Sequence, residues 1–222
     1  MPVGFDMDRE PRTMDQHCQR MAAVWAKAYD AGEDRWSHTA ASRWTSAVVI
    51  ASLNPVSRVL DVGTGRGIDA VRYAAEGHTV TGIDLVALPE WVGIESRWPS
   101  VRFEQGALLD HVTCEPYDVI VDAGCFHHQH PADLDRHLAH IRRLLRPGGT
   151  MWLATLTPRE AHDTHAPHLA QPQTDGSFTL AFTEVEIRER LARTGFKVVN
   201  AKVQPRHRLN GLDDLLLRVT PR

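Results

Sequence analysis

The sequence predicts an α/β fold: a seven-stranded, mostly parallel sheet with one antiparallel strand in a C-terminal hairpin, preceded by a helical lead-in. Three observations carry this prediction. An apolar strand pattern ends in a turn with glycines at Gly63, Gly65 and Gly67, and a helical pattern follows. Strand and helix patterns then alternate, which is typical of a parallel sheet with right-handed crossovers. Near the end, two strand patterns follow each other with no helix between them, and strands joined in this way pair antiparallel.

The lead-in contains two predicted helices. The first runs from about Thr13 to Tyr29 and is amphipathic, and the second runs from about Thr39 to Leu53. Trp25 and Tyr29 are interpreted as core residues. Trp36, in the link between the helices, is either partly buried surface or part of a lid over a ligand.

The parallel part of the sheet is predicted from five apolar runs separated by helical or turn-forming segments. These strands are Val59–Val62, Val80–Asp84, Val101–Gln105, Tyr117–Asp122 and Thr150–Thr155. A helix over Ala132–Leu145 connects the last two, and the Pro147-Gly148-Gly149 run after it is a strong stop signal. Ligands of such sheets bind at the carboxyl ends of the strands.

The last segment begins with a capping box, in which Thr183 and Glu186 open a helix that closes at Gly195. The strands Phe196–Val203 and Leu215–Thr220 then form the terminal hairpin. This reversed finish is unusual for nicotinamide-binding domains.

The glycine turn points to a nucleoside ligand. Glycine adopts positive φ and lets a ligand approach the main chain, and an acid such as Asp84 at the end of the next strand is suited to bind a ribose. Two cofactor classes fit this outline, dinucleotides and S-adenosylmethionine. The dinucleotide pattern G-x-G-x-x-G requires a third glycine at position 68, where this sequence has Ile68. The third glycine, Gly67, comes one residue earlier, so the dinucleotide pattern is not met. Asp61, before the turn, could attract the amino group of a methionine moiety, which favours S-adenosylmethionine.

Composition limits the other classes. The formal net charge is −3 and there is no basic block, so we expect no nucleic-acid partner. No apolar run approaches the length of a membrane span, and the first residues lack a secretory pattern. Cys18, Cys114 and Cys125 form no CxxC pair, which predicts reduced thiols and no structural zinc. We expect a cytoplasmic monomer or homodimer that acts on a small molecule.

Two motifs carry a resemblance to a known family. The run V-L-D-V-G-T-G-R-G over residues 59–67 resembles the first motif of the class I S-adenosylmethionine-dependent methyltransferases. The strand Tyr117–Asp122 with the following 123–128 is similar to the fourth-strand motif of small-molecule methyltransferases, nearest the thiopurine, halide-thiol and tellurite-resistance group. The spacing of the lead-in aromatic residues and the segment 144–149 are similar too. The resemblance covers about residues 21–155.

The resemblance implies a Rossmann-like methyltransferase fold in a single domain, residues 1–222. Its expected parts are a helical cap (1–54), a cofactor-binding core (55–155), a substrate loop or lid (156–182), and a C-terminal helix and hairpin (183–222).

The resemblance also implies the cofactor-binding residues. They are Asp61, Gly63, Thr64, Gly65, Arg66, Gly67, Asp84, Leu85, Gly106, Ala107, Leu108, Asp122 and Cys125. Asp84 would accept hydrogen bonds from both ribose hydroxyls. Many family members carry an acid where Ala107 stands, so here Asp110 or a backbone carbonyl would have to bind the adenine amino group, or the affinity for the cofactor would be lower.

The implied reaction is in-line methyl transfer to an oxygen, nitrogen or sulfur atom, which mainly requires alignment of the acceptor. His127 and His128 follow the fourth strand, and one of them is predicted to act as a base or to orient the substrate. Alternatively, one packs and the other binds a loop. The predicted substrate-contacting residues are Trp36, His127, His128, Arg206 and His207.

Other interpretations stay open. Histidines 162, 165 and 168 are spaced by three, but histidine alone at this spacing does not indicate a metal site, and none is predicted. The chain could be a fold member that binds the cofactor without transferring a methyl group, because fold does not fix function. A dinucleotide-dependent oxidoreductase and a nucleic-acid methyltransferase are disfavoured.

Overall fold

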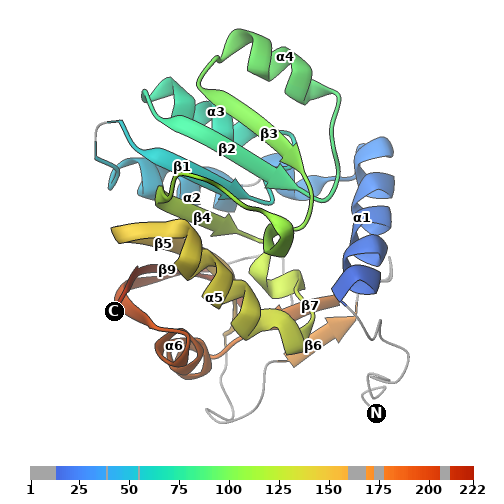
Figure 1. Cartoon of the computed structure of the whole chain (residues 1–222). Coiled ribbons are helices and arrows are strands. Elements are labelled where there is room, and N and C mark those ends of the chain that lie inside the picture. Colours follow the sequence, from blue (N-terminus) through green and yellow to red (C-terminus); the bar gives the residue numbers. More distant parts are fainter. Residues whose placement is uncertain (1–13, 39, 55, 160–168, 173–177, 206–210) are drawn as a thin grey trace.

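The structure is a computed structural model that describes residues 14–38, 40–54, 56–159, 169–172, 178–205 and 211–222. Figure 1 shows a central twisted sheet whose seven strands lie in the order β3-β2-β1-β4-β5-β9-β8. The first five are parallel to one another, whereas β9 pairs antiparallel with both β5 and β8. The predicted fold class, with one reversed strand in the C-terminal hairpin, is therefore confirmed.

The strands agree with the predicted segments to within a few residues at most ends. The main sheet is formed by β1 (Arg58–Val62), β2 (Thr79–Asp84), β3 (Val101–Gln105), β4 (Tyr117–Ala123), β5 (Leu145–Pro158), β8 (Phe196–Gln204) and β9 (Leu212–Pro221). A separate two-stranded hairpin is formed by β6 (Leu169–Pro172) and β7 (Phe178–Ala181).

Helices cover both faces of the sheet. They are α1 (Met14–Asp30), α2 (Ala40–Ile50), α3 (Ile68–Ala75), α4 (Glu90–Arg97), α5 (Leu134–Leu144) and α6 (Glu184–Arg193), and the short 3-10 turns are η2 (Arg35–His38), η3 (Leu108–Asp110), η4 (Phe126–His128) and η5 (Pro131–Asp133). α5 and α6 pack on one face, and α2 and α3 pack on the other. Thr183 caps α6 as predicted, because its hydroxyl accepts the N–H of Glu186 at 3.1 Å. Among the described residues, none of the helices has the length and apolar character of a membrane span.

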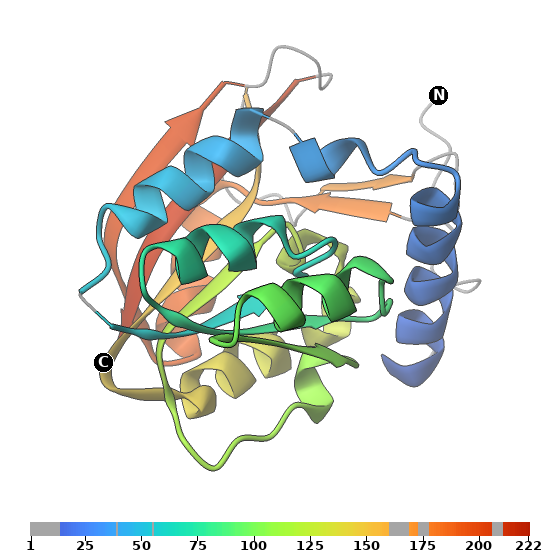
Figure 2. The same cartoon turned by 90° about the horizontal axis from the view of Figure 1, so that it is seen from above.

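α1 does not pack on either face. It stands at the end of the sheet toward which the parallel strands point (Figure 1), and the β6–β7 hairpin reaches toward it from the C-terminal half (Figure 2). The carboxyl ends of β1, β2 and β4 therefore face a wall built from segments at both ends of the chain. This arrangement positions the site.

Three predicted boundaries were wrong. The helix expected over 39–53 ends at Ile50, and the one expected from Ala132 begins at Leu134 after the turn η5. β5 was expected from Thr150 but begins at Leu145, so the Pro-Gly-Gly run, which follows the end of the helix as predicted, belongs to the strand. The expected loop 156–182 contains the end of β5 and the β6–β7 hairpin, which short polar segments did not reveal.

Candidate functional site

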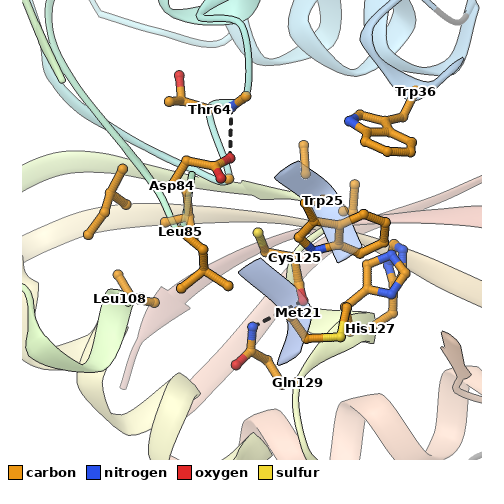
Figure 3. A pocket seen from close by; sticks show the side chains of 18 of the residues that line it. Met21, Trp25, Trp36, Thr64, Asp84, Leu85, Leu108, Cys125, His127 and Gln129 are labelled. Carbon is orange, nitrogen blue, oxygen red and sulfur yellow. Dashed lines mark hydrogen bonds between the residues drawn. The ribbon is translucent and has the colours of Figure 1, made fainter. Parts of the chain in front are cut away.

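A cavity of about 430 Å³ lies between the carboxyl ends of the parallel strands and the lead-in formed by α1 and η2 (Figure 3). One end is formed by the glycine turn after β1 and by the tips of β2, β3 and β4. The opposite wall carries aromatic and histidine side chains. The volume of the cavity is in the range of cofactor and small-molecule sites.

Close contacts and positive φ values require glycine at two positions of the turn after β1. Gly63 and Gly65 have φ values of 73° and 51°, and the N–H of Gly63 donates to the carbonyl of Ile83 at 2.8 Å. A Cβ atom on Gly63 would lie 2.2 Å from the sulfur of Cys125, and one on Gly65 would lie 2.9 Å from the hydroxyl of Tyr29. A side chain at either position would fill the space in which a ligand could approach the backbone.

Asp84 lies at the tip of β2 and faces this turn (Figure 3). Its Oδ2 accepts the N–H of Gly65 at 2.9 Å, and its Oδ1 accepts the N–H of Val86 at 3.0 Å. Burial raises the pKa of Asp84, while the backbone donors oppose that shift. The carboxylate is thus held rigidly at the cavity with acceptor capacity left for the hydroxyls of a ligand.

The tips of β2 and β3 add an apolar wall. Leu85, Gly106, Ala107 and Leu108 all line the cavity as predicted. Asp110, one of the two predicted partners for an adenine amino group, is exposed and does not line the cavity. A backbone carbonyl as the partner and a lower affinity for the cofactor are the two alternatives that remain.

Three of the predicted cofactor residues lie beneath the cavity instead of lining it. Gly67 packs against the ring of Phe103. Asp61 is 4% exposed and its Oδ2 accepts the hydroxyl of Thr64 at 2.7 Å. Burial and the nearby acid Asp69 raise the pKa of Asp61 to about 7. The role of Asp61 in binding an amino group therefore stays a prediction.

Asp122, the third, is fully buried and organises the loop after β4. Its Oδ1 accepts the N–H groups of Cys125 and Phe126 at 3.0 and 2.9 Å, and its Oδ2 lies 2.7 Å from Nε2 of His137. Cys125 does line the cavity, and burial raises the pKa of its thiol, which keeps the thiol neutral. The pair Asp122–His137 thus fixes the backbone on which Cys125 and His127 are mounted.

The two predicted catalytic histidines lie together at the cavity wall. His127 is buried, and its ring lies 4.4 Å from that of His128. The ring of His128 packs edge-on against Trp25 at 5.0 Å, and its carbonyl oxygen lies 2.8 Å from Nε2 of His17 on α1. The structure therefore brings both histidines to the cavity, and the choice between base and packing role stays a prediction.

The lead-in supplies an aromatic wall, which is Trp25, Tyr29 and Trp36. Trp25 and Trp36 are seen in Figure 3. The ring of Trp25 lies 5.1 Å from that of Trp36, and the ring of Tyr29 lies 5.7 Å from Trp36. The indole N–H of Trp36 donates to the hydroxyl of Tyr29 at 3.4 Å. Tyr29 is buried and Trp25 packs against the same apolar cluster, as predicted, and both also line the cavity, whereas Trp36 is 40% exposed at its rim.

Sequence reasoning missed the polar residues at the far end of the cavity. Thr45 from α2, Thr179 from β7 and Asp214 from β9 line it, and all three are buried. Asp214 faces Leu156 in the β5–β9 register. Two acids at the start of the apolar run Leu212–Leu217 were a usable signal, because buried carboxylates in a strand need polar surroundings.

Some predicted residues lie outside the described part of the chain: Arg206, His207 and the three spaced histidines 162, 165 and 168. Among the described residues, no group of three or more potential ligands has the arrangement of a metal site.

Comparisons with known proteins show which family this chain is similar to. A family model described as a methyltransferase domain matches residues 35–201. The 1,6-didemethyltoxoflavin-N1-methyltransferase of Burkholderia thailandensis, solved with 1,6-didemethyltoxoflavin and S-adenosylhomocysteine, is 30% identical; the match covers 96% of this chain and 92% of that one, with a TM-score of 0.85. The DhpI–SAM–HEP complex is 20% identical and shares the fold, with a TM-score of 0.67 over 96% of this chain and 100% of DhpI.

A ubiquinone biosynthesis O-methyltransferase of Sodalis glossinidius is 29% identical over 166 residues, which is 72% of this chain. The chain spans 59% of the length of that relative. Together these comparisons confirm the predicted Rossmann-like fold and the predicted cofactor, S-adenosylmethionine. The glycine turn and Asp84 fit this cofactor. Its nucleoside part needs to approach the backbone closely and to bind a carboxylate at the tip of the neighbouring strand.

Proposed function

Because this chain belongs to the methyltransferase domain family, we propose that it transfers a methyl group from S-adenosylmethionine to a ring nitrogen of a small planar heteroaromatic molecule. The observation that carries the proposal is the shared cavity, in which a nucleoside-binding end faces a wall of Trp25, Trp36 and two histidines. The didemethyltoxoflavin methyltransferase, with its bound heteroaromatic substrate, supports the choice of acceptor.

The proposed cofactor contacts follow from the geometry. Gly63 and Gly65 leave room at the backbone, Asp84 accepts from hydroxyls, and Leu85 and Leu108 cover an apolar ring. When bound, S-adenosylmethionine supplies a methyl group on a good leaving group. The protein has to orient the acceptor and exclude water, and such positioning can contribute about 7–11 kcal/mol.

The proposed acceptor contacts lie across the cavity. Trp25 and Trp36 offer flat apolar surfaces that suit a planar ring. Thr45, Thr179 and Asp214 offer hydroxyl and carboxylate groups that suit the N–H and C=O groups of a heterocycle. His127 or His128 would take the ring N–H proton, since an imidazole is matched to neutral pH.

Several finer assignments are part of this proposal. We assign the chain to the neighbourhood of the thiopurine, halide-thiol and tellurite-resistance methyltransferases, and we expect a cytoplasmic monomer or homodimer without a nucleic-acid partner. The ubiquinone O-methyltransferase relatives favour a second candidate, methylation of a phenolic oxygen. A fold member that binds the cofactor without transferring its methyl group is the remaining alternative.

An acceptor panel tests the proposal. The purified protein is incubated with S-adenosylmethionine and either 1,6-didemethyltoxoflavin, other N–H heterocycles, catechols or small thiols, and release of S-adenosylhomocysteine is measured. We expect turnover with N–H heterocycles, and Trp25→Ala should lower kcat/KM for them at least about tenfold because stacking is lost. Turnover of catechols alone would support the phenolic alternative. Cofactor binding without turnover of any acceptor would reject methyl transfer to these classes.

A further inference from the structure

Arg66 follows the second glycine of the turn, yet its guanidinium is directed at the lead-in. Its Nε donates to Oδ2 of Asp34 at 2.7 Å, and its Nη2 donates to Oδ1 of Asp34 at 3.0 Å. The same Nη2 donates to the carbonyl of Tyr29 at 3.3 Å, and Nη1 binds Glu90 on α4. A planar fork that engages both oxygens of one carboxylate fixes orientation as well as distance.

Asp34 is built for this pairing. It lies between α1 and η2, is 8% exposed, and also accepts the hydroxyl of Ser37 at 2.6 Å. The guanidinium of Arg66 holds the pKa of Asp34 down to about 2, so the carboxylate stays charged at neutral pH. A surface ion pair would add little, but this carboxylate is withdrawn from water on one side.

The pair connects the cofactor turn to the aromatic wall. Asp34 is two residues before Trp36, and the guanidinium of Arg66 lies over the ring of Tyr29 at 5.4 Å. The hydroxyl of Tyr29 in turn packs against Gly65. The far end of α1 is held separately, by the contact between His17 and the His128 carbonyl. The lead-in is thus attached at two points on opposite sides of the cavity.

We propose that Arg66 and Asp34 are positioning residues that hold Trp25, Tyr29 and Trp36 against the cofactor turn and thereby set the affinity for the acceptor. Arg66 was predicted as a cofactor residue, and the proposal gives it a different role. It rests on the proposed function, because it assumes that the aromatic wall contacts the acceptor.

Two substitutions that each remove one charge of the pair, and a matched control, test the proposal. Asp34→Asn and Arg66→Gln both break the pair, whereas Glu90→Gln removes an Arg66 partner that does not belong to the lead-in. We expect Asp34→Asn and Arg66→Gln to raise KM for the acceptor at least about tenfold and to change the calorimetric Kd for S-adenosylhomocysteine less than about threefold. The control Glu90→Gln should change neither KM nor Kd. The exchanged pair Asp34→Arg with Arg66→Asp should recover part of the loss.

A second readout does not depend on the acceptor. Acrylamide quenching of tryptophan fluorescence in the complex with S-adenosylhomocysteine should increase in Asp34→Asn and stay at the wild-type level in Glu90→Gln, because Trp25 and Trp36 lose their anchor. If the wild type turns over no acceptor, the proposed function fails while this measurement still decides the role of the pair. A parallel loss of S-adenosylhomocysteine affinity in Asp34→Asn and Arg66→Gln, or unchanged quenching, would overturn the proposal.

Discussion

At the scale of single residues, Asp84 is the side chain on which cofactor binding should depend most. Its carboxylate is fixed by the N–H groups of Gly65 and Val86 and faces the cavity. Hydrogen bonds to a charged acceptor are worth about 1.5–3 kcal/mol. We therefore expect Asp84→Ala to weaken S-adenosylmethionine binding at least about tenfold, as measured by isothermal titration calorimetry.

The neighbouring acid Asp110 is the matched control for this prediction. It is exposed, lies two positions after Leu108 and does not line the cavity. Asp110→Ala should leave the affinity unchanged. Equal affinities for Asp84→Ala and the wild type would remove Asp84 from the cofactor site.

Single residues also show how far the sequence can predict the site. Gly63, Gly65 and Asp84 belong to local motifs whose spacing already encodes a turn beside a strand tip. Thr45 and Thr179 carry no such pattern, because each reaches the cavity only when α2 and β7 are packed in place. The role of a residue that depends on tertiary packing is not written in its own neighbourhood.

At the scale of elements, the turn after β1 and the loop after β4 are in contact through one glycine. Gly63→Ala would place its Cβ 2.2 Å from the sulfur of Cys125 and would force alanine to a φ of 73°. Both effects destabilise the folded state, each by about 1–3 kcal/mol. Urea unfolding of Gly63→Ala in the wild-type and Cys125→Ala backgrounds separates them.

The overlap with sulfur should be relieved in the Cys125→Ala background, whereas the φ cost should persist there. Gly77→Ala measures the φ cost alone, because Gly77 has a φ of 89° and no heavy atom near its added Cβ. Identical losses for Gly63→Ala in the two backgrounds would show that the contact with Cys125 contributes nothing.

Elements also differ in how well the sequence predicts them. The buried strands and α3 were found because their apolar runs are long and end in clear glycine signals. α4 was missed because only Trp91 among its side chains is buried, whereas α3, which is equally long, buries three side chains and follows the glycine turn. The β6–β7 hairpin was missed because its two four-residue strands lie inside a polar segment, where alternation over so few positions is not diagnostic.

At the scale of the whole molecule, two buried carboxyl groups change the free energy of unfolding in opposite directions as the pH is varied. The raised pKa of Asp61, about 7, means that the folded state binds the extra proton between about pH 4 and 7, so Asp61 removes stability as pH rises through that window. The lowered pKa of Asp34, about 2, means that its contribution is lost only as pH falls from about 4 toward 2.

We therefore expect Asp61→Asn to gain stability relative to the wild type as pH rises from about 5 to 7, by at most about 1.4 kcal/mol per pH unit, and to keep a constant difference above that range. Urea unfolding of the cofactor-free protein at several pH values measures this. A pH-independent difference for Asp61→Asn would mean that Asp61 titrates normally.

The two sides of the cavity come from different parts of the chain, and this has a consequence for how the selectivity of such an enzyme can change. The glycine turn, the strand tips and the two histidines come from the middle of the sequence, while the rest of the opposite wall comes from α1, η2 and α2 before it and from β7 and β9 after it. β9 pairs with β5, and α2 packs on the same sheet as the central strands, so an exchange of the terminal portions between homologues has to preserve this packing. Within that constraint, substitutions at the cavity side of these elements change the opposite wall and leave the glycine turn and Asp84 in place.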